Sequence, residues 1–224
     1  IGYPCVFKTR TLGYDGHGQA VIRTPEDIAR AEPYLGVPAI LEEFVPFDYE
    51  ASIVMVNDGE RIVSFPIGQN IHRDGILDLC IVPAPRMDDA VRARLVEQSE
   101  AFMRRCGYTG ILAIEYFVKG GELYFNEMAP RPHNSGHYTI EGCTTNQFRE
   151  LCRYLLGEPL QEPRLVAPTV MKNILGEDLA AAEAVAAETG AEGAQSPEEG
   201  VYVHLYGKSV SKPKRKMGHI TFVG

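Results

Sequence analysis

Two glutamates near the middle of the chain have a spacing that could bind a divalent cation. Glu115 lies in the apolar segment ILAIEYFV, and Glu127 lies in ELYFNEMAPRPHNSGH, 127 − 115 = 12 positions later. If a hairpin loop is centred on Gly121, the two carboxylates face each other across neighbouring strands, where Cβ atoms are about 4.5–5.5 Å apart and like charges are destabilising. Mg²⁺ takes one or two carboxylates together with phosphate oxygens and water. We therefore predict that Glu115 and Glu127 bind a Mg²⁺ ion that also carries phosphate.

The predicted pairing of the two glutamates depends on the register of this hairpin. With the turn at Lys119-Gly120-Gly121 and the centre at Gly121, Phe117 and Phe125 share the face of the two glutamates. Asn126 then points to the opposite face, although twist at the end of the strand could return it to the metal. A two-residue loop would instead place the glutamates on opposite faces, because a slip of one residue inverts a strand.

A dense polar loop follows the second glutamate. The segment APRPHNSGH carries Arg131, His133 and Asn134 between prolines. Arginine recognises phosphate or carboxylate groups through two parallel hydrogen bonds. A plain solvated loop is the alternative for His133, but loops this rich in polar side chains at a strand end more often serve binding.

Two segments nearer the amino terminus have the composition of a nucleotide site. KTRTLGYDGHGQA places Lys8 at a strand end before a glycine-rich loop, where backbone N–H groups could approach phosphate closely. It is not a Walker A motif, because no G-K-[ST] opens a helix. LEEFVPFDYE offers Glu42, Val45 and Glu50 for adenine and ribose. Taken singly, each segment is more simply explained as a solvated loop or as exposed strand ends.

Near the carboxyl terminus, HLYGKSVSKPKRKMGHI gathers basic side chains in a chain whose net charge is −8. The flanking strand-like segments argue against a localisation signal or a nucleic-acid patch, and phosphate capture fits better. The basic residues are Lys208, Lys212, Lys214, Arg215 and Lys216.

Composition bounds the class of protein. The 224 residues suffice for one large domain or two small ones. Net negative charge argues against general nucleic-acid binding, and there is no apolar run long enough to span a membrane. Five cysteines without a C-x-x-C pattern indicate reduced thiols and a cytoplasmic location. Because the chain opens with Ile1-Gly2-Tyr3-Pro4 and no initiator Met, we expect it to begin in mid-protein.

The expected elements indicate an α+β fold in two layers. A proline-rich boundary is expected at 157–168 and an acidic linker at 190–200. Strands are expected at 5–9, 20–22, 39–43, 50–56, 61–66, 76–82, around Glu115 and Glu127, and at 169–174, 202–206 and 217–223. Helices are expected from Thr24-Pro25, from Asp88-Asp89 to about Arg105, and near 144–156 and 178–188.

Taken together and in order, the motifs resemble those of the ATP-grasp superfamily, and within it the N5-carboxyaminoimidazole ribonucleotide synthetases. The matching segments are KTRTLGYDGHGQA, ILEEFVPFDYEAS, NIHRDGIL, NEMAPRPHNSGH and HLYGK…RKMGHI. The resemblance implies an ATP-grasp fold over 1–157 and a small β-rich domain over 168–224, without the family's amino-terminal domain. It also implies a cytoplasmic homodimer that uses ATP and Mg²⁺ to carboxylate 5-aminoimidazole ribonucleotide with bicarbonate in purine biosynthesis.

The resemblance implies residue roles as well. Lys8 would contact the ATP phosphates under the 13–19 loop, Glu42 and Val45 would hold adenine, Glu50 would hold ribose, and Glu115 and Glu127 would bind Mg²⁺. The implied ATP-site residues are Lys8, Gly13, Tyr14, Asp15, Gly16, His17, Gly18, Gln19, Glu42, Glu43, Phe44, Val45, Glu50, His72, Asn126 and Glu127. Arg131, His133, Asn134, Lys208 and Arg215 would hold the aminoimidazole ribonucleotide and the bicarbonate-derived group. Tyr14, Asp15 and Arg131 would act at the reacting centre, with Asp15 as a proton acceptor.

Two alternatives stay open. One is another ATP-grasp ligase, such as a formate-dependent transformylase or a biotin-carboxylase-like enzyme, against which NEMAPRPHNSGH and RKMGH argue. The other is an ATP-binding fragment without catalysis, since the implied amino-terminal domain would supply part of the substrate site. His17 stands where family members usually carry Lys or Arg, which makes charge on the loop depend on pH near neutrality.

Overall fold

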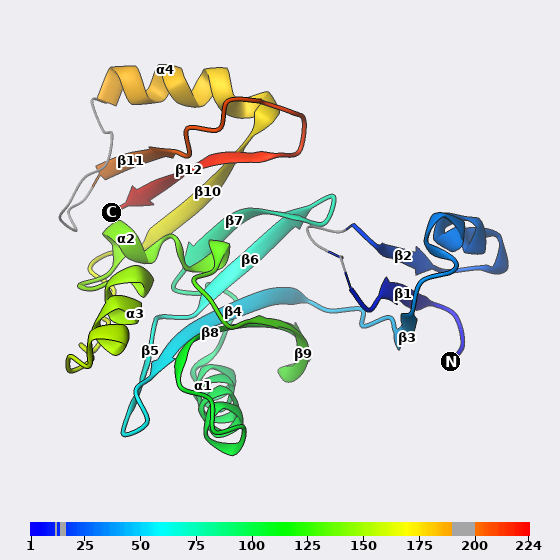
Figure 1. Ribbon diagram of the computed structural model, residues 1–224, viewed down its shortest axis with the longest axis horizontal. Helices are drawn as coiled ribbons and strands as arrows, with labels where there is room; N and C mark the ends of the chain where they lie inside the picture. The colour runs from blue at the N-terminus through cyan, green and yellow to red at the C-terminus, as the bar shows by residue number, and fades with distance from the viewer. Residues whose placement is uncertain (12, 14–16, 190–199) are drawn as a thin grey trace. The chain divides into compact units, whose positions relative to one another are not determined.

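The computed structural model describes residues 1–11, 13, 17–189 and 200–224, so Tyr14, Asp15, Gly16 and most of the expected acidic linker lie outside it. The chain forms two compact units (Figure 1). One comprises residues 1–47 with 72–76, and the other comprises 48–71 with 77–224.

The first unit is a three-stranded antiparallel sheet with one helix. Its strands are β1 (Cys5–Thr9), β2 (Gln19–Ile22) and β3 (Ala39–Glu43), in the order β2-β1-β3. The helix expected after Thr24 is a 3₁₀ helix, η1 (Pro25–Tyr34), and contains Pro33, which lacks the N–H of an α-helical ladder. Asp27 accepts hydrogen bonds from the Arg23 and Thr24 N–H groups at its start. The small core consists of Cys5, Ala20, Ile22 and Ala31.

The second unit is built on a nine-stranded sheet, in the order β11-β12-β10-β7-β6-β4-β8-β9, with β5 paired to β4. Figure 1 shows these strands from cyan to red. The tip of the β6–β7 hairpin, residues 72–76, is counted with the first unit. The strands are β4 (Tyr49–Asn57), β5 (Ile62–Ser64), β6 (Gly68–Arg73), β7 (Ile76–Val82), β8 (Gly110–Lys119), β9 (Glu122–Ala129), β10 (Thr169–Leu175), β11 (Gly200–Leu205) and β12 (Lys216–Val223).

Helices cover both faces of the central strands. Helix α1 (Asp89–Arg105) packs Leu95 and Met103 against Ile53 and Ile114 on one face. On the other face, α2 (Thr139–Gly142) and α3 (Gln147–Leu156) cover a second core. Strands buried on both faces are nearly continuous apolar runs, which is why SIVMV in β4 and ILAI in β8 lack alternation.

The remaining helix and the helix ends follow from local sequence. Helix α4 (Leu179–Thr189) packs Ala182 against a core that includes Val203 and Ile220, after the short 3₁₀ turn η3 (Gly176–Asp178). The Asp88 carboxylate caps α1 by accepting from the Val91 N–H. Asn146 caps α3 in the same way, and Gly157 ends it in the left-handed region at φ 69°.

The structure confirms the expected strands and helices with shifts of a few residues at their ends. It adds two elements that the sequence did not predict, β6 and α2, together with the 3₁₀ turn η2 (Asn134–Gly136). Among the helices of the described residues, none combines the length and the apolar character needed to cross a bilayer.

Candidate active site

The β8–β9 hairpin brings Glu115 and Glu127 together by a route that the sequence did not predict. Lys119 pairs with Glu122, so the turn is the two residues Gly120-Gly121, both at positive φ, and the expected centre at Gly121 is wrong. This register continues to Tyr116, which pairs with Phe125. The next pair is nevertheless Glu115 with Glu127, because a bulge takes Asn126 out of the ladder. The predicted pairing of the glutamates is therefore confirmed.

The bulge also changes which aromatic side chains accompany the glutamates. Phe125 lies edge-on to the Tyr116 ring, 6.4 Å between centroids, and 6.5 Å from the Phe102 ring of α1. It therefore belongs to the α1 face, and the expectation that Phe125 shares the face of Glu115 is wrong. Because side chains alternate along a strand, Phe117 stays on the face of Glu115.

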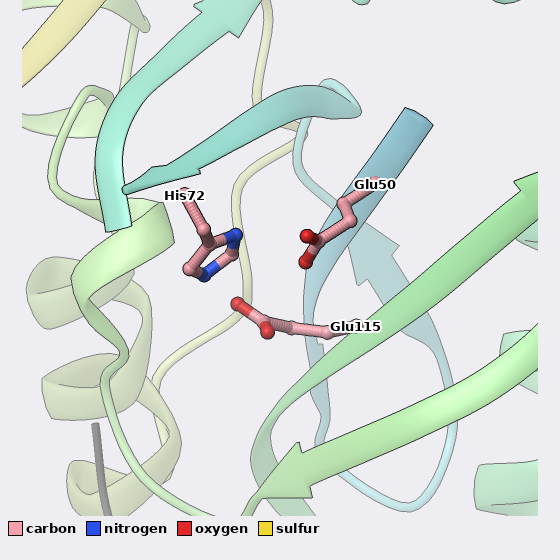
Figure 2. A group of neighbouring side chains, drawn as sticks. All are labelled: Glu50, His72 and Glu115. Atoms are coloured by element: carbon pink, nitrogen blue, oxygen red, sulfur yellow. The ribbon is translucent and has the colours of Figure 1, made fainter. Parts of the chain in front are cut away.

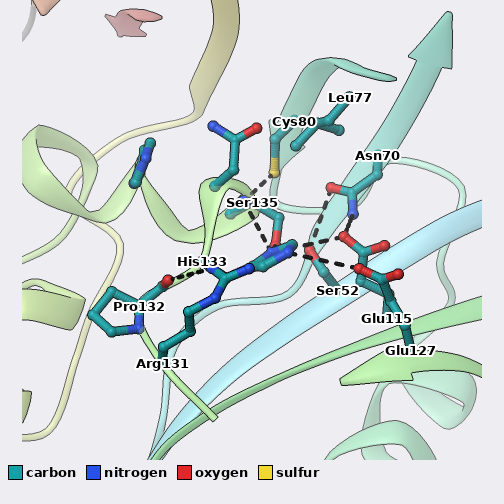
Figure 3. A network of polar contacts seen from close by, with 12 residues as sticks. Ser52, Asn70, Leu77, Cys80, Glu115, Glu127, Arg131, Pro132, His133 and Ser135 are labelled. Carbon is teal, nitrogen blue, oxygen red and sulfur yellow. Dashed lines mark hydrogen bonds and ion pairs between the residues drawn. The ribbon is translucent and has the colours of Figure 1, made fainter. Parts of the chain in front are cut away.

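The two carboxylates differ in environment. Glu115 is 6% exposed, whereas the Glu127 side chain is 62% exposed. The Asn70 Nδ2 group of β6 donates to Glu115 Oε1 at 3.4 Å, and Asn70 Oδ1 accepts from Ser52 Oγ at 3.3 Å (Figure 3). Asn70 and Ser52 were not predicted. Burying a carboxylate is costly unless it is paired, and the Asn70 hydrogen bond supplies part of the compensation for Glu115.

His133 supplies part of that compensation. Its Nδ1 lies 3.8 Å from Glu115 Oε1 and its Nε2 lies 3.9 Å from Glu127 Oε1, which would be ion pairs with a protonated ring (Figure 3). Ser135 Oγ is 2.9 Å from the same Nδ1. One ligand atom from each of Glu115, Glu127 and His133 fits within a mutual separation of 4.8 Å.

The residues present fit a hard divalent cation. Two opposed carboxylates, one of them buried, offer the oxygen ligands that Mg²⁺ prefers, and the exposed Glu127 leaves room for phosphate and water. Glu115 and Glu127 would hold such an ion, and it would neutralise charge on a bound polyphosphate. Asn126 is the bulged residue directly before Glu127, and the face that its side chain takes stays a prediction.

Glu50 lies beside Glu115. It sits on β4, paired with Asn70 of β6 and Phe117 of β8, while Glu115 pairs with the next residue on the same face of β4, Ser52. One carboxylate oxygen of Glu50 lies within 4.8 Å of one of Glu115, and Figure 2 shows the two side chains converging from neighbouring strands. His72 is the second-last residue of β6, in the hairpin tip that is counted with the first unit.

In the first unit, two of the residues predicted to bind the nucleotide, Lys8 and Glu42, form an ion pair. Lys8 Nζ is 2.6 Å from Glu42 Oε2, with both side chains partly exposed. Lys8 pairs with Gln19 across β1 and β2, and the Gly18 carbonyl accepts from the Thr9 N–H at 2.8 Å. Gly18 needs its positive φ of 76°, and a Cβ there would lie 2.5 Å from Thr9 Oγ1.

Residues 44–47, which follow β3, are held by backbone hydrogen bonds and by a contact between Arg23 and the Phe44 ring. The Phe44 N–H donates to the Pro4 carbonyl at 3.3 Å, and the Arg23 guanidinium lies 5.7 Å from the centre of the Phe44 ring. The Val45 carbonyl accepts from the Phe47 N–H at 2.9 Å. Glu43 ends β3 directly before this turn. Gly13 and His17 are also described, and a Cβ at Gly13 would lie 3.1 Å from the His17 carbonyl.

The remaining predicted residues belong to two loops of the second unit. Arg131 is exposed and donates to the Pro132 carbonyl at 3.0 Å, while Asn134 bonds to Asn173 of β10. Lys208 Nζ donates to the Lys216 carbonyl and lies 5.3 Å from the centre of the Tyr206 ring. Arg215 donates to the Val210 carbonyl at 2.6 Å. Both basic side chains therefore fold back on their own loop.

A cluster of three histidines, His137, His204 and His219, was not predicted from the sequence. The His219 ring lies 4.9 Å from that of His137 and 4.5 Å from that of His204, and Tyr206 Oη is 2.9 Å from His219 Nδ1. His204 Nε2 is 2.6 Å from Glu141 Oε1, whose side chain is fully buried. Burial, helped by the neighbouring histidines, lowers the pKa of His137 to about 4 and that of His219 to about 2, and burial raises the pKa of Tyr206 to about 12.

Two family models match this chain. That of the ATP-grasp domain covers residues 1–148. The chain belongs to the ATP-grasp family. A second model, the phosphoribosylaminoimidazole carboxylase C-terminal domain, matches residues 169–224.

Curated relatives of this ATP-grasp chain include the N5-carboxyaminoimidazole ribonucleotide synthases of Pseudomonas aeruginosa, 42% identical over 99% of this chain, and of Staphylococcus haemolyticus, 38% identical over all of it. The phosphoribosylaminoimidazole carboxylase of Saccharomyces cerevisiae is 37% identical over all of this chain, which spans 39% of that protein. The chain spans 58% of the length of each of the two bacterial synthases.

Solved structures give the same result. A crystal structure of an ADP complex of N5-carboxyaminoimidazole ribonucleotide synthetase has a TM-score of 0.91 and 38% identity, covering all of this chain and 58% of the other. The synthase of Aspergillus clavatus in complex with ADP and 5-aminoimidazole ribonucleotide has a TM-score of 0.85 and 29% identity, with the same coverage. The predicted ATP-grasp fold with a small carboxyl-terminal β domain is thereby confirmed, while the division at 157–168 stays a prediction.

Proposed function

We propose that this chain is the nucleotide-binding and acceptor-binding part of an ATP-dependent carboxyligase that forms N5-carboxyaminoimidazole ribonucleotide. The observation that carries the proposal is the Glu115–Glu127 pair with the 131–134 segment directly after it. The proposed site for a phosphate-bound cation and the proposed site for a second substrate are therefore only a few residues apart along the chain. Relatives over the whole chain are named for this reaction.

The division of roles follows the two units. In the first unit, Lys8 and the described glycines of the 13–19 loop would hold phosphate, and Glu42 with the backbone of Val45 would hold adenine. In the second, Glu50 would meet ribose, and Glu115 and Glu127 would hold Mg²⁺. Lys8 and Glu42 bond to each other in this structure, so the proposal requires Lys8 to exchange its carboxylate partner for phosphate when ATP binds.

In the proposed reaction the protein mainly aligns the substrates and stabilises their charge, and covalent catalysis has little part. ATP would phosphorylate bicarbonate to carboxyphosphate, and the carboxyl group would pass to the amine of the ribonucleotide with release of phosphate. Phosphoryl transfer of this kind depends on positioning and electrostatic stabilisation. Arg131, His133 and Asn134, with Lys208 and Arg215, would hold the two acceptors. The proposed parts of Tyr14 and Asp15 lie outside the described residues.

Several finer points belong to the proposal as well. Magnesium as the metal, bicarbonate as the carboxyl source, a homodimer and a cytoplasmic location rest on the family resemblance. The ADP and 5-aminoimidazole ribonucleotide seen with the Aspergillus clavatus structure support the two organic ligands.

The decisive experiment measures phosphate release from ATP by this chain joined to the amino-terminal domain that the family resemblance implies. The proposal expects release only when bicarbonate and 5-aminoimidazole ribonucleotide are both present. Release with formate instead of bicarbonate would favour the transformylase alternative. ATP binding without release under any of these conditions would contradict catalysis and leave a nucleotide-binding module.

A further inference from the structure

Two buried side-chain amides hold the segment that carries the proposed acceptor-binding residues. Gln147 opens α3 and Asn173 lies in the middle of β10, and both are 0% exposed. Neither was singled out in the sequence. Both contact residues 133–137, the stretch that contains His133 and Asn134. Buried amides are hydrogen-bonded as a rule. Here the hydrogen-bond partners also determine which end of each amide is the donor and which is the acceptor.

Asn173 takes its orientation from the backbone. Its Nδ2 group donates to the Leu77 carbonyl at 2.7 Å and to Asn134 Oδ1 at 2.7 Å, while its Oδ1 accepts from Asn134 Nδ2 at 2.8 Å. A carbonyl oxygen can only accept, so the Nδ2 side of Asn173 must face Leu77. The Asn134 amide is then fixed in turn, with its oxygen toward Asn173 Nδ2.

Gln147 takes its orientation from the backbone in the same way. Its Oε1 accepts from the His133 N–H at 2.9 Å, and its Nε2 donates to the His133 carbonyl at 2.9 Å. The same Nε2 lies 3.0 Å from His137 Nδ1. Because Nε2 of Gln147 can only donate, the Nδ1 atom of His137 accepts, and the proton of the neutral ring lies on Nε2. Burial lowers the pKa of His137 to about 4, which keeps the ring neutral near pH 7.

We propose that Asn173 and Gln147 are positioning residues for the acceptor, Asn173 by setting which way round the Asn134 amide stands and Gln147 by setting the His133 backbone and the His137 tautomer. The ligand class is an aminoimidazole nucleotide, so this inference rests on the proposed function. An amide has two N–H groups and two lone pairs. The pairing with Asn173 uses one N–H and one lone pair of the Asn134 amide. The other N–H and the other lone pair would then bind a heterocycle in one defined orientation.

The first test is Asn173→Asp in the 224-residue chain. Aspartate has the same shape but cannot donate when ionised, so the Leu77 carbonyl and Asn134 Oδ1 both lose their donor. We expect the side-chain ¹H–¹⁵N resonances of Asn134 to shift and the affinity for 5-aminoimidazole ribonucleotide to fall by roughly tenfold or more. Mg·ATP affinity should stay at the wild-type value. Unchanged Asn134 resonances with unchanged ribonucleotide affinity would overturn the role of Asn173.

Asn57→Asp is the matched control. Asn57 is also a buried amide, and its Nδ2 donates to the Tyr108 carbonyl at 2.7 Å, far along the chain from residues 133–137. This variant loses the same kind of bond and should lower thermal stability. It should leave ribonucleotide affinity and the Asn134 resonances unchanged. An equal loss of affinity in both variants would mean that Asn173 acts only through general stability.

The second test is Gln147→Glu, read by ¹⁵N NMR of the imidazole nitrogens. We expect the wild-type His137 to carry its proton on Nε2. A glutamate at 147 can only accept when ionised, so the proton should move to Nδ1. A wild-type ring protonated on Nδ1, or the same tautomer in both proteins, would overturn the role of Gln147.

These readouts separate the inference from the function on which it rests. Wild-type chain that shows the expected Asn134 and His137 signals but does not bind 5-aminoimidazole ribonucleotide contradicts the proposed function and leaves the orientation of the two side chains standing. Wild-type chain that binds the ribonucleotide, with Asn173→Asp binding equally well, contradicts the positioning role alone.

Discussion

Glu115 lies directly opposite Glu127 because Asn126 is bulged out of the ladder between β8 and β9. The two-residue turn at Gly120-Gly121 by itself would have put these carboxylates on opposite faces of the sheet. One inserted residue reverses that outcome. The pairing of Glu115 with Glu127 on which the proposed metal site rests therefore depends on this bulge.

Moving the second carboxylate onto the bulged residue should remove the proposed metal site. The exchange variant, Asn126→Glu combined with Glu127→Asn, moves the carboxylate onto the residue that the bulge takes out of the ladder and removes it from the position opposite Glu115. We expect Mn²⁺ binding, measured by calorimetry or electron paramagnetic resonance, to fall at least tenfold relative to wild type. Deletion of Asn126 is the control, because Glu127 then follows Phe125 directly and stays opposite Glu115 in a regular ladder, and we expect binding within a few-fold of wild type. An exchange variant that is folded by circular dichroism and binds Mn²⁺ as wild type does would show that residue 126 is not the bulged residue.

Lys8 should matter for nucleotide affinity far more than for stability. Its ion pair with Glu42 joins side chains that are 26% and 42% exposed, and such pairs contribute only about 0–1 kcal/mol. Lys8→Met should therefore change the free energy of unfolding in urea by less than about 1 kcal/mol. The affinity for ATP should fall roughly tenfold, as a charge-assisted phosphate contact is lost. Lys119→Met, at the exposed turn of the β8–β9 hairpin, is the control, and an equal effect there would argue against a specific role for Lys8.

The histidine cluster should make stability depend on pH in a predictable direction. Burial lowers the pKa of His219 to about 2, whereas an unfolded histidine has a pKa of about 6.5. Between these values the unfolded chain binds the extra proton, so the contribution to stability is complete above pH 6.5 and is lost as the pH falls. His137, with a pKa of about 4, acts in the same direction over the window from about 6.5 down to 4.

This dependence can be measured by comparing variants. The free energy of unfolding of wild type should fall more steeply between pH 6 and pH 4.5 than that of His219→Gln, by about 1 kcal/mol per pH unit. His17→Gln, which removes an exposed histidine, should keep the wild-type slope. Parallel slopes for wild type and His219→Gln would show that His219 is not held neutral by the fold.

Local sequence signals predicted most of the elements and failed where a single residue broke the pattern. The helix start at Asp88-Asp89 and the apolar runs of β4 and β8 are local signals, and the structure follows them. The β8–β9 register was predicted for the right glutamates but with the wrong turn, because a bulge leaves no mark in the hydrophobic pattern. Phe125 was assigned to the wrong face for the same reason.

The partners of the site could not be read from the sequence at all. Asn70, Gln147 and Asn173 are polar residues inside otherwise ordinary segments, and only the packing of β6, α3 and β10 brings them to Glu115 and to the 133–137 segment. The site motifs themselves were visible because they are contiguous. The family comparisons confirm the fold, while the residue roles remain proposals that variants must test.

Glu115 and Glu127 are proposed to bind a divalent cation together with ATP. The most direct measurement is calorimetric titration of the 224-residue chain with ATP, with and without Mg²⁺, for wild type, Glu127→Gln and Glu122→Gln. Glu122 lies on the same strand, at the turn, and is the matched control. We predict ATP binding that Mg²⁺ strengthens at least tenfold in wild type and Glu122→Gln, and no such strengthening in Glu127→Gln. Equal Mg²⁺ dependence in all three proteins, or ATP binding that does not respond to Mg²⁺, would contradict the claim.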